Sequence, residues 1–159
     1  MINETELVLD KTDLQILRLM QDNARMSNAD LARELGMAPS GVLERVKKLE
    51  QKGVIQQYIT RINPVALQQK MLAFIFMKAN DGPGCTDTAV ALSKIPEVQE
   101  VHHIAGDDCY LVKVRTYDSA SLVSLMRNNF SLIPDLLSTR TTIVLETVKE
   151  QQQLVIPEN

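Results

Sequence analysis

The sequence has few cysteines, and they do not follow the pattern of a cross-linked or metal-binding protein. Its 159 residues include only two, Cys85 and Cys109. Two cysteines cannot form the disulfide framework of a small secreted domain, and their spacing is not that of metal ligands. We therefore interpret both as packing residues or free thiols. For the chain as a whole, we expect no metal site, no cofactor and no catalytic residues.

Long apolar runs are also missing. No stretch approaches the roughly 20 apolar residues that a membrane-spanning helix needs. The first residues, MINETELVLDKTD, lack the basic and then apolar order of a signal peptide. With 45% hydrophobic and 23% charged residues, the chain is predicted to be a globular protein of one or two small domains in the cytoplasm.

The chain lacks a large excess of either charge, and its net charge of −3 is unevenly distributed. Residues 1–64 contain nine basic and nine acidic side chains, whereas residues 65–159 contain eight and eleven. Between residues 45 and 61 a single acid, Glu50, accompanies five bases: Arg45, Lys47, Lys48, Lys52 and Arg61. Such a local basic face can bind phosphates even in an acidic protein, although many basic helix faces are simply solvated.

Two short helices are predicted near the start of the chain. Residues 13–23 carry apolar side chains at helical spacing, and Asp10 or Thr12 is a suitable N-cap. Ser27 and Asp30, three residues apart, resemble the capping box of a second helix.

A third helix follows after a tight turn. Gly36 is in the position that ends the second helix, Pro39 suits the first turn of the third, and Gly53 stops it. Its expected inward residues are Val42, Val46 and Leu49. Three short helices with a tight turn between the last two are typical of a helix-turn-helix domain.

In a helix-turn-helix the last helix lies in the DNA major groove, which admits one helix. We expect its first residues to approach base edges and its basic residues to contact phosphates. The predicted base-facing residues are Pro39, Ser40, Gly41, Leu43 and Glu44. The predicted phosphate contacts are Arg45, Lys47 and Lys48. Arg45 has an alternative role, which is to hold the third helix by pairing with an acid such as Asp13.

The rest of the chain predicts an α+β domain. Residues 54–63 look β-like, and Asn63-Pro64 is a turn or hinge signal. Strands are predicted at 71–79, 97–106, 109–116 and 139–149, and helices at 86–95 and 118–130. This β-α-β-β-α-β order matches a ferredoxin-like sandwich. The expected divisions are a helix-turn-helix domain at 1–58, a linker at 59–69, the sandwich at 70–150 and a tail at 151–159.

The first strand of this domain is apolar on both faces. One face carries Leu72, Phe74 and Phe76, and the other carries Ala73, Ile75 and Met77. Two helices can cover only one face of a four-stranded sheet, and a solvated second face would alternate apolar with polar residues. We therefore predict that the second face meets another subunit, in at least a homodimer.

The sequence from Leu9 to Ile55 resembles the DNA-binding half of the Lrp/AsnC (leucine-responsive, feast/famine) regulators. The similarity includes L-D-x-x-D, the segment DNARMSN, L-A-x-x-x-G and R-V-x-x-L-E-x-x-G-V-I. It continues through Asn63-Pro64, a Gly-Asp turn before Tyr110, and TTIVLETVK. The resemblance implies a transcription regulator that binds double-stranded DNA and whose βαββαβ domain dimerises. It also implies further assembly to a tetramer or octamer and, often, an amino-acid effector.

The third helix departs from the family pattern. Many relatives have Ser or Thr where Ala38 stands, so the usual N-cap oxygen is missing and free N–H groups either meet a phosphate or are solvated. Gly41 and Leu43 replace polar residues common in relatives. We therefore expect few hydrogen bonds to bases and a larger contribution from DNA shape.

The resemblance also implies an effector site at the turn before the third strand. Backbone N–H groups of a turn can bind a carboxylate and an Asp can accept from an ammonium, which suits a zwitterion. The expected residues are Gly106, Asp107, Asp108, Cys109, Tyr110, Thr139 and Thr141. Cys109 stands where relatives often have a second Asp. The alternative is an ordinary β-turn, in which Gly and Asp are common.

Two other functions remain open from the sequence. An architectural protein that wraps DNA without a ligand, at the bacterial nucleoid, would need the same helices. Sirohaem decarboxylases have a similar architecture and use histidines, and His102-His103 lies near Asp107 and Cys109 in sequence. Adjacent strand residues point to opposite faces, so at most one of these histidines can line a given pocket.

Overall fold

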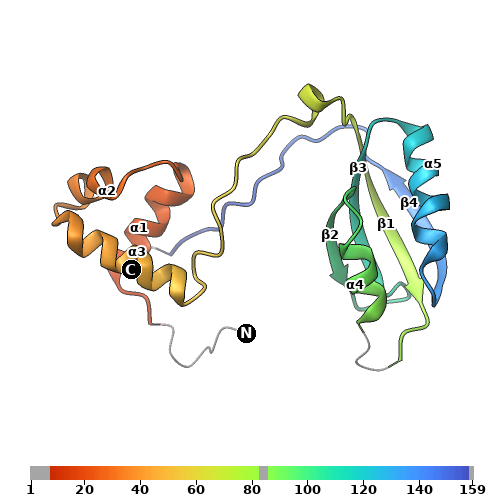
Figure 1. Cartoon of the computed structure of the whole chain (residues 1–159), viewed down its shortest axis with the longest axis horizontal. Coiled ribbons are helices and arrows are strands. Elements are labelled where there is room, and N and C mark those ends of the chain that lie inside the picture. Colours follow the sequence, from red (N-terminus) through yellow and green to blue (C-terminus); the bar gives the residue numbers. More distant parts are fainter. Residues whose placement is uncertain (1–7, 83–85, 158–159) are drawn as a thin grey trace. The chain divides into compact units, whose positions relative to one another are not determined.

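The computed structural model describes residues 8–82 and 86–157, which form two compact units (Figure 1). One unit combines Met1–Arg61 with Glu150–Asn159, and the other is Ile62–Lys149. Each has its own hydrophobic core. No helix within the described ranges has the length and apolar character to cross a membrane. Cys85 lies outside the described residues, whereas Cys109 is a half-buried free thiol.

Three helices make up the first unit: α1 (Lys11–Asp22), α2 (Asn28–Leu35) and α3 (Pro39–Gln51). Capping boxes at Asp10 and Ser27 begin α1 and α2, and in each the side chain accepts from the backbone N–H three residues later. The core of this unit consists of Ile16, Leu31, Ala32, Val42, Val46 and Leu49. The predicted three-helix arrangement is confirmed.

The second unit contains a four-stranded antiparallel sheet and two helices. Its strands are β1 (Met71–Ala79), β2 (Val98–His103), β3 (Tyr110–Thr116) and β4 (Leu136–Ile143). Its α-helices are α4 (Asp87–Ser93) and α5 (Ser119–Asn128), with 3-10 turns η2 (Pro64–Leu67) and η3 (Phe130–Leu132). The sheet order is β2-β3-β1-β4, so the predicted βαββαβ sandwich is confirmed.

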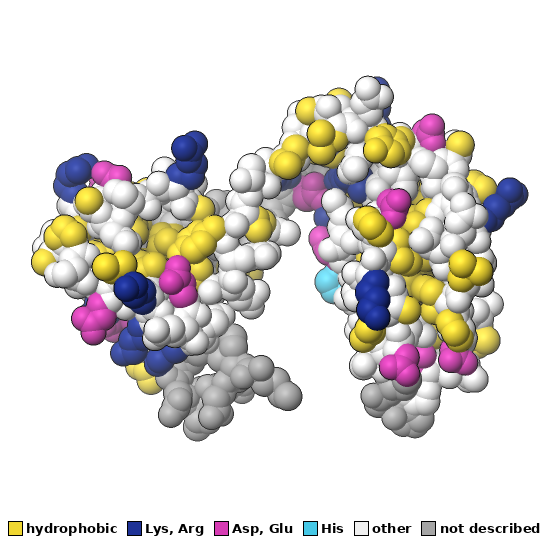
Figure 2. Space-filling view, viewed as in Figure 1, with side chains coloured by type: hydrophobic (Ala, Val, Ile, Leu, Met, Phe, Trp, Pro, Cys, Tyr) yellow, Lys and Arg dark blue, Asp and Glu magenta, His cyan; other side chains and the backbone are white. Residues whose placement is uncertain are grey.

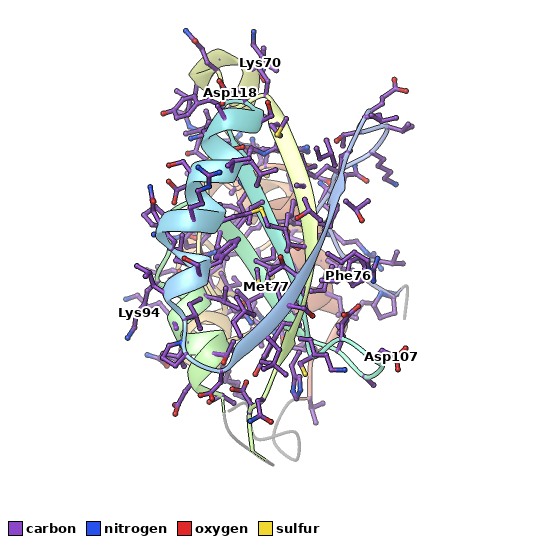
Figure 3. All side chains as sticks on the ribbon, turned by 90° about the vertical axis from the view of Figure 1, so that its right-hand side faces the viewer. Lys70, Phe76, Met77, Lys94, Asp107 and Asp118 are labelled. Carbon is purple, nitrogen blue, oxygen red and sulfur yellow. The ribbon has the colours of Figure 1, made fainter. Side chains whose placement is uncertain are left out.

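Both helices lie against one face of the sheet, and the other face is not covered by them (Figure 3). Ala73, Ile75 and Met77 point into the helix-covered core and are fully buried. Phe74 and Phe76 point to the opposite face, called the open face below, and are half-buried. Figure 3 shows the same division for Phe76 and Met77.

Three strand predictions were wrong in extent. The second strand of the sandwich was expected at 97–106, but it is Val98–His103. Residues 54–63 form no strand, because no described segment pairs with their backbone in a ladder. The last strand was expected at 139–149, but it begins at Leu136 and ends at Ile143. Ile143 pairs with Ala73, and the pairing ends one residue later, where the Val144 N–H donates to the Leu72 carbonyl at 2.9 Å near the start of β1.

Candidate nucleic-acid interface and effector turn

The position of α3 follows from the turn that precedes it. Gly36 ends α2 with φ at +63°, a left-handed conformation that glycine adopts at low cost. The next helix begins at Pro39, whose missing N–H is not needed in the first turn. Gly53 follows α3 with φ at +69° and turns the chain away. The sequence predicted these three positions correctly.

One side of α3 is buried, and the predicted DNA-contacting residues lie around the rest of it. Val42, Val46 and Leu49 face the core of the first unit. Six predicted contacts are exposed: Pro39, Ser40, Leu43, Glu44, Lys47 and Lys48. Gly41 and Arg45 are half-buried at the flank. In Figure 2, the Lys and Arg side chains of this unit are dispersed among acidic and apolar ones.

The N-terminus of α3 has no side-chain cap, as the sequence predicted from Ala38. The carbonyl of Ala38 accepts from the N–H groups of Gly41 at 3.0 Å and Val42 at 3.2 Å. A helix start carries a partial positive charge and unsatisfied N–H groups, which favour a nearby anion. No side chain competes for that position here.

Arg45 pairs with two carboxylates of the first helix. Its Nη1 lies 2.6 Å from Asp10 Oδ2 and 2.7 Å from Asp13 Oδ1. The hydrogen bonds that Arg45 donates to Asp10 and then to Asp13 raise the pKa of Arg45. The Asp13 partner was anticipated, whereas Asp10, 35 residues away in sequence, was not. These contacts, called the Arg45 clasp below, connect α3 to the start of α1.

Tyr58 is a residue that the sequence reasoning missed. Its hydroxyl donates to Glu50 Oε1 of α3 at 2.8 Å. Burial and the Glu50 carboxylate raise the pKa of Tyr58 to about 12. Beside α3, Tyr58 lines a groove of about 450 Å³ together with Met20, Met26, Leu43 and Lys47, among others. The signal was weak because Tyr58 lies in an irregular segment after the helix.

The predicted effector turn joins β2 to β3, and its members differ in exposure. Asp107 is exposed at the turn (Figure 3). Asp108 is half-buried, and its Oδ2 lies 2.9 Å from Arg140 Nη2 on β4. Arg140 in turn stacks over Phe76, 4.0 Å from the ring centre. The turn is thus tied by an ion pair to the open face of the sheet.

Cys109 and Tyr110 serve the structure of the turn. Cys109 donates its backbone N–H to the Met77 carbonyl at 2.9 Å, and its Sγ lies 3.4 Å from the Ala79 oxygen. Tyr110 is 1% exposed, and its hydroxyl donates to Asp81. Asp81 also accepts from Thr88 at 2.7 Å. Asp81 therefore connects the beginning of β3 to α4, a role that its position in a breaker segment did not suggest.

Thr139 and Thr141 lie on the other side of β4 from Arg140. They pair with Met77 and Ile75, both of which face the helices, and Thr141 Oγ1 lies 4.0 Å from Met126 Sδ of α5. Within one chain, the ion pair of Asp108 and these two hydroxyls are therefore on opposite faces of the sheet. Gly106 has φ at +146°, which suits a glycine at the turn.

The two histidines point to opposite faces, as expected for neighbours on a strand. His102 Nε2 lies 3.2 Å from Glu100 Oε2, and the ring of His103 packs against Tyr110 with centroids 5.2 Å apart. Across residues 8–82 and 86–157, no group of three or more His, Cys, Asp or Glu side chains is arranged to hold a metal ion.

Comparison with known families assigns both parts of the chain. Residues 9–56 match a winged helix-turn-helix DNA-binding domain, and residues 72–154 match the Lrp/AsnC ligand binding domain. The leucine-responsive regulatory proteins of Escherichia coli and Salmonella typhimurium are 37% identical over 150 residues, covering 93% of this chain and 92% of theirs. Both relatives are regulatory proteins by their names.

Solved structures of similar fold include regulators bound to an amino acid. A Neisseria meningitidis transcriptional regulator in complex with L-Met has a TM-score of 0.85 and 27% identity, covering 93% of this chain and 97% of that one. A Mycobacterium tuberculosis feast or famine regulatory protein, complexed with L-methionine, has a TM-score of 0.86 and 31% identity, covering 94% and 100%. With its three-helix unit, its exposed α3 and its βαββαβ unit all matched, the chain belongs to the Lrp/AsnC family of DNA-binding transcriptional regulators.

Proposed function

We propose that α3 reads the DNA major groove and that its exposed residues divide into two groups. Pro39, Ser40, Gly41, Leu43 and Glu44 approach base edges near the start of the helix. Lys47 and Lys48 bind phosphates, which fixes the position of the helix without specifying sequence. The observation that supports a DNA-facing surface is the solvent exposure of α3 on the side away from Val42, Val46 and Leu49.

The phosphate contacts are tested by the salt dependence of binding. Lys47→Ala and Lys48→Ala should each reduce the slope of log affinity against log salt concentration by about one, because each removes one released counterion. Lys94→Ala, which changes an exposed lysine after α4 in the second unit, is the matched control. Slopes equal to that of the wild type in both α3 variants would contradict the assignment.

We infer limited base-specific hydrogen bonding by α3. Gly41 offers no side chain and Leu43 no donor or acceptor, so DNA shape and deformability supply part of the selectivity. A binding-site selection from random duplexes should return a degenerate consensus. A long, sharply defined consensus under α3 would contradict this inference.

We propose that the open face of the sheet joins two copies of the chain. Phe74, Phe76 and Leu111 leave this face partly apolar, and the register places them on adjacent strands. Phe76→Glu should lower the mass measured by light scattering to that of a monomer, whereas Val123→Glu on α5 should leave at least a dimer. A wild-type monomer at micromolar concentration would contradict the proposal.

We propose that tetramers or octamers assemble from these dimers.

We propose an amino acid as the effector, bound where subunits meet. The L-Met complexes of two relatives support this ligand class. The opposite positions of Asp108 and the pair Thr139 and Thr141 in one chain support a site completed by a second copy. The full set of residues proposed for it is Gly106, Asp107, Asp108, Cys109, Tyr110, Thr139 and Thr141.

Calorimetry with each of the twenty amino acids tests the effector, starting with methionine. Asp107→Ala should abolish the heat of binding if the carboxylate accepts from the ligand ammonium. No binding by any amino acid would remove the sensing role. DNA affinity that is unchanged by a bound amino acid would instead favour ligand-independent wrapping of DNA at the nucleoid, because a ligand acts only through differential affinity.

A further inference from the structure

The C-terminal tail lies against α1 in the first unit. Gln21 Nε2 donates to the Leu154 carbonyl at 2.8 Å, and the Leu154 N–H donates to Gln21 Oε1 at 2.8 Å. Gln153 Nε2 donates to the Gln21 carbonyl at 3.2 Å. Arg18 Nη2 donates to the carbonyls of Ile156, at 3.4 Å, and Pro157. Hydrogen bonds to α1 therefore hold residues 153–157.

The Gln21 side chain binds the main chain of the tail in the way that a neighbouring strand would. The side-chain amide of Gln21 both donates to and accepts from the peptide groups of Leu154, as a neighbouring strand would. Leu154 and Val155 are 76% and 99% exposed, so burial of apolar surface contributes little. A contact made of exposed hydrogen bonds has a small net free energy, and the tail can therefore undock without unfolding the unit.

The docked tail adds a second connection between the two units. The chain leaves the first unit between Arg61 and Ile62, forms the whole second unit, and returns between Lys149 and Glu150. When the tail is docked, the first unit is joined to the second at two points instead of one. A second tether reduces the range of positions that a joined domain can reach.

The tail and α3 are held by opposite ends of the same helix. Gln21 lies in the last turn of α1, whereas Asp10 and Asp13 of the Arg45 clasp lie at its start. α1 and α3 also share the core of the first unit, through Ile16, Val42 and Val46, so a tail docked on α1 is fixed relative to α3.

We propose that residues 150–157 act as a strap. When the strap is docked on α1, it restricts the range of positions that α3 of each subunit can take relative to the second unit. The proposal rests on the DNA-binding role and the dimer argued above. It adds a specific surface on α1, formed by Arg18 and Gln21, whose partner is the main chain of this protein's own tail.

Two changes release the strap in the full assembled protein. Gln21→Ala removes both side-chain hydrogen bonds to Leu154, so the Leu154 amide should exchange hydrogen roughly ten-fold faster. A chain ending at Lys149 removes the strap entirely. Gln15→Ala, at an exposed position of α1 that makes none of the hydrogen bonds to the tail given above, is the matched control.

The functional measurement is the affinity for duplexes carrying two half-sites at a series of spacings. The wild type and Gln15→Ala should prefer one spacing sharply. Gln21→Ala and the shortened chain should tolerate other spacings, with the ratio of best to worst affinity reduced roughly three-fold or more, because the DNA-reading helices can then reach a wider range of positions.

Any of three results would overturn the proposal. If the tail is released or absent and the spacing preference is that of the wild type, the strap does not restrict the position of α3. An equal change in Gln15→Ala would trace the effect to α1 itself and not to its contact with the tail. A wild-type protein that binds no duplex would end the DNA-binding role and the strap together, whereas normal binding with an unaltered preference ends the strap alone.

Discussion

The positive charge of Arg45 is matched within the protein by Asp10 and Asp13, at 2.6 and 2.7 Å. A guanidinium already paired with two carboxylates adds little to counterion release at a phosphate. Arg45→Ala should therefore leave the salt slope of DNA binding close to that of the wild type, while lowering the denaturation midpoint of the first unit. A slope reduced by about one would instead identify Arg45 as a phosphate contact.

The same clasp predicts a pH dependence. A backbone hydrogen bond from Asp13 and then the Arg45 guanidinium lower the pKa of Asp10 in the folded protein. Because the folded pKa is lowered, this carboxylate stabilises the protein at pH values above its unfolded pKa of about 3.9. The stabilisation is lost as pH falls through the folded pKa. Urea titrations should show Asp10→Asn less stable than the wild type at neutral pH, with the difference shrinking below about pH 4. A constant difference would contradict this.

Tyr58 should titrate late. Because its folded pKa is raised to about 12, the neutral phenol stabilises the protein below the unfolded value near 10, and this is lost between about pH 10 and 12. Ultraviolet titration should show a phenolate signal near pH 12 that Tyr58→Phe removes. Tyr117→Phe, at a 60% exposed tyrosine, should leave that signal in place.

Side-chain partners were the least predictable feature from sequence. Asp10 was recognised as a cap but not as a partner of Arg45, because helical spacing describes one helix and not which helices meet. The hydrogen bond from Tyr58 to Glu50 was missed for the same reason. Asp81 was interpreted only as part of a breaker, although the folded chain brings it to both Tyr110 and Thr88.

A variant at the N-cap of α3 tests whether the free N–H groups there bind a DNA phosphate. Ala38→Ser supplies the missing oxygen and should stabilise the first unit by about 1 kcal/mol. If a DNA phosphate uses the same N–H groups, affinity should stay level or fall despite the added stability. Thermal denaturation and DNA titration of the same variant separate the two effects; tighter binding in proportion to stability would argue against a phosphate there.

Helix boundaries were predicted better than strand boundaries. Caps, Gly36 and Pro39 are local signals, and each was found where expected. A strand needs a partner, so residues 54–63 could not be judged from their own composition. The end of β4 lies opposite the start of β1, which the composition of residues 139–149 does not indicate. The β1 strand at 71–79 was predicted in full because turns bound it on both sides.

Two separate cores imply two unfolding events. Ile16, Leu31 and Val42 belong to the first core, and Ile75 and Leu92 belong to the second. Leu31→Ala should cost the first unit about 2–5 kcal/mol and lower only one of two calorimetric transitions. A single transition that moves as a whole would show that the units unfold together.

The strand order β2-β3-β1-β4 also has a consequence for synthesis on the ribosome. The three-helix unit emerges before the sheet, and its core needs only neighbouring segments. One edge of β1, in contrast, stays without its partner until Leu136–Ile143 has been translated, after β2, β3 and both helices of the second unit. A nascent chain therefore carries a folded DNA-reading domain before its sheet can close, and that unpaired edge is where premature association between polysomal neighbours would begin.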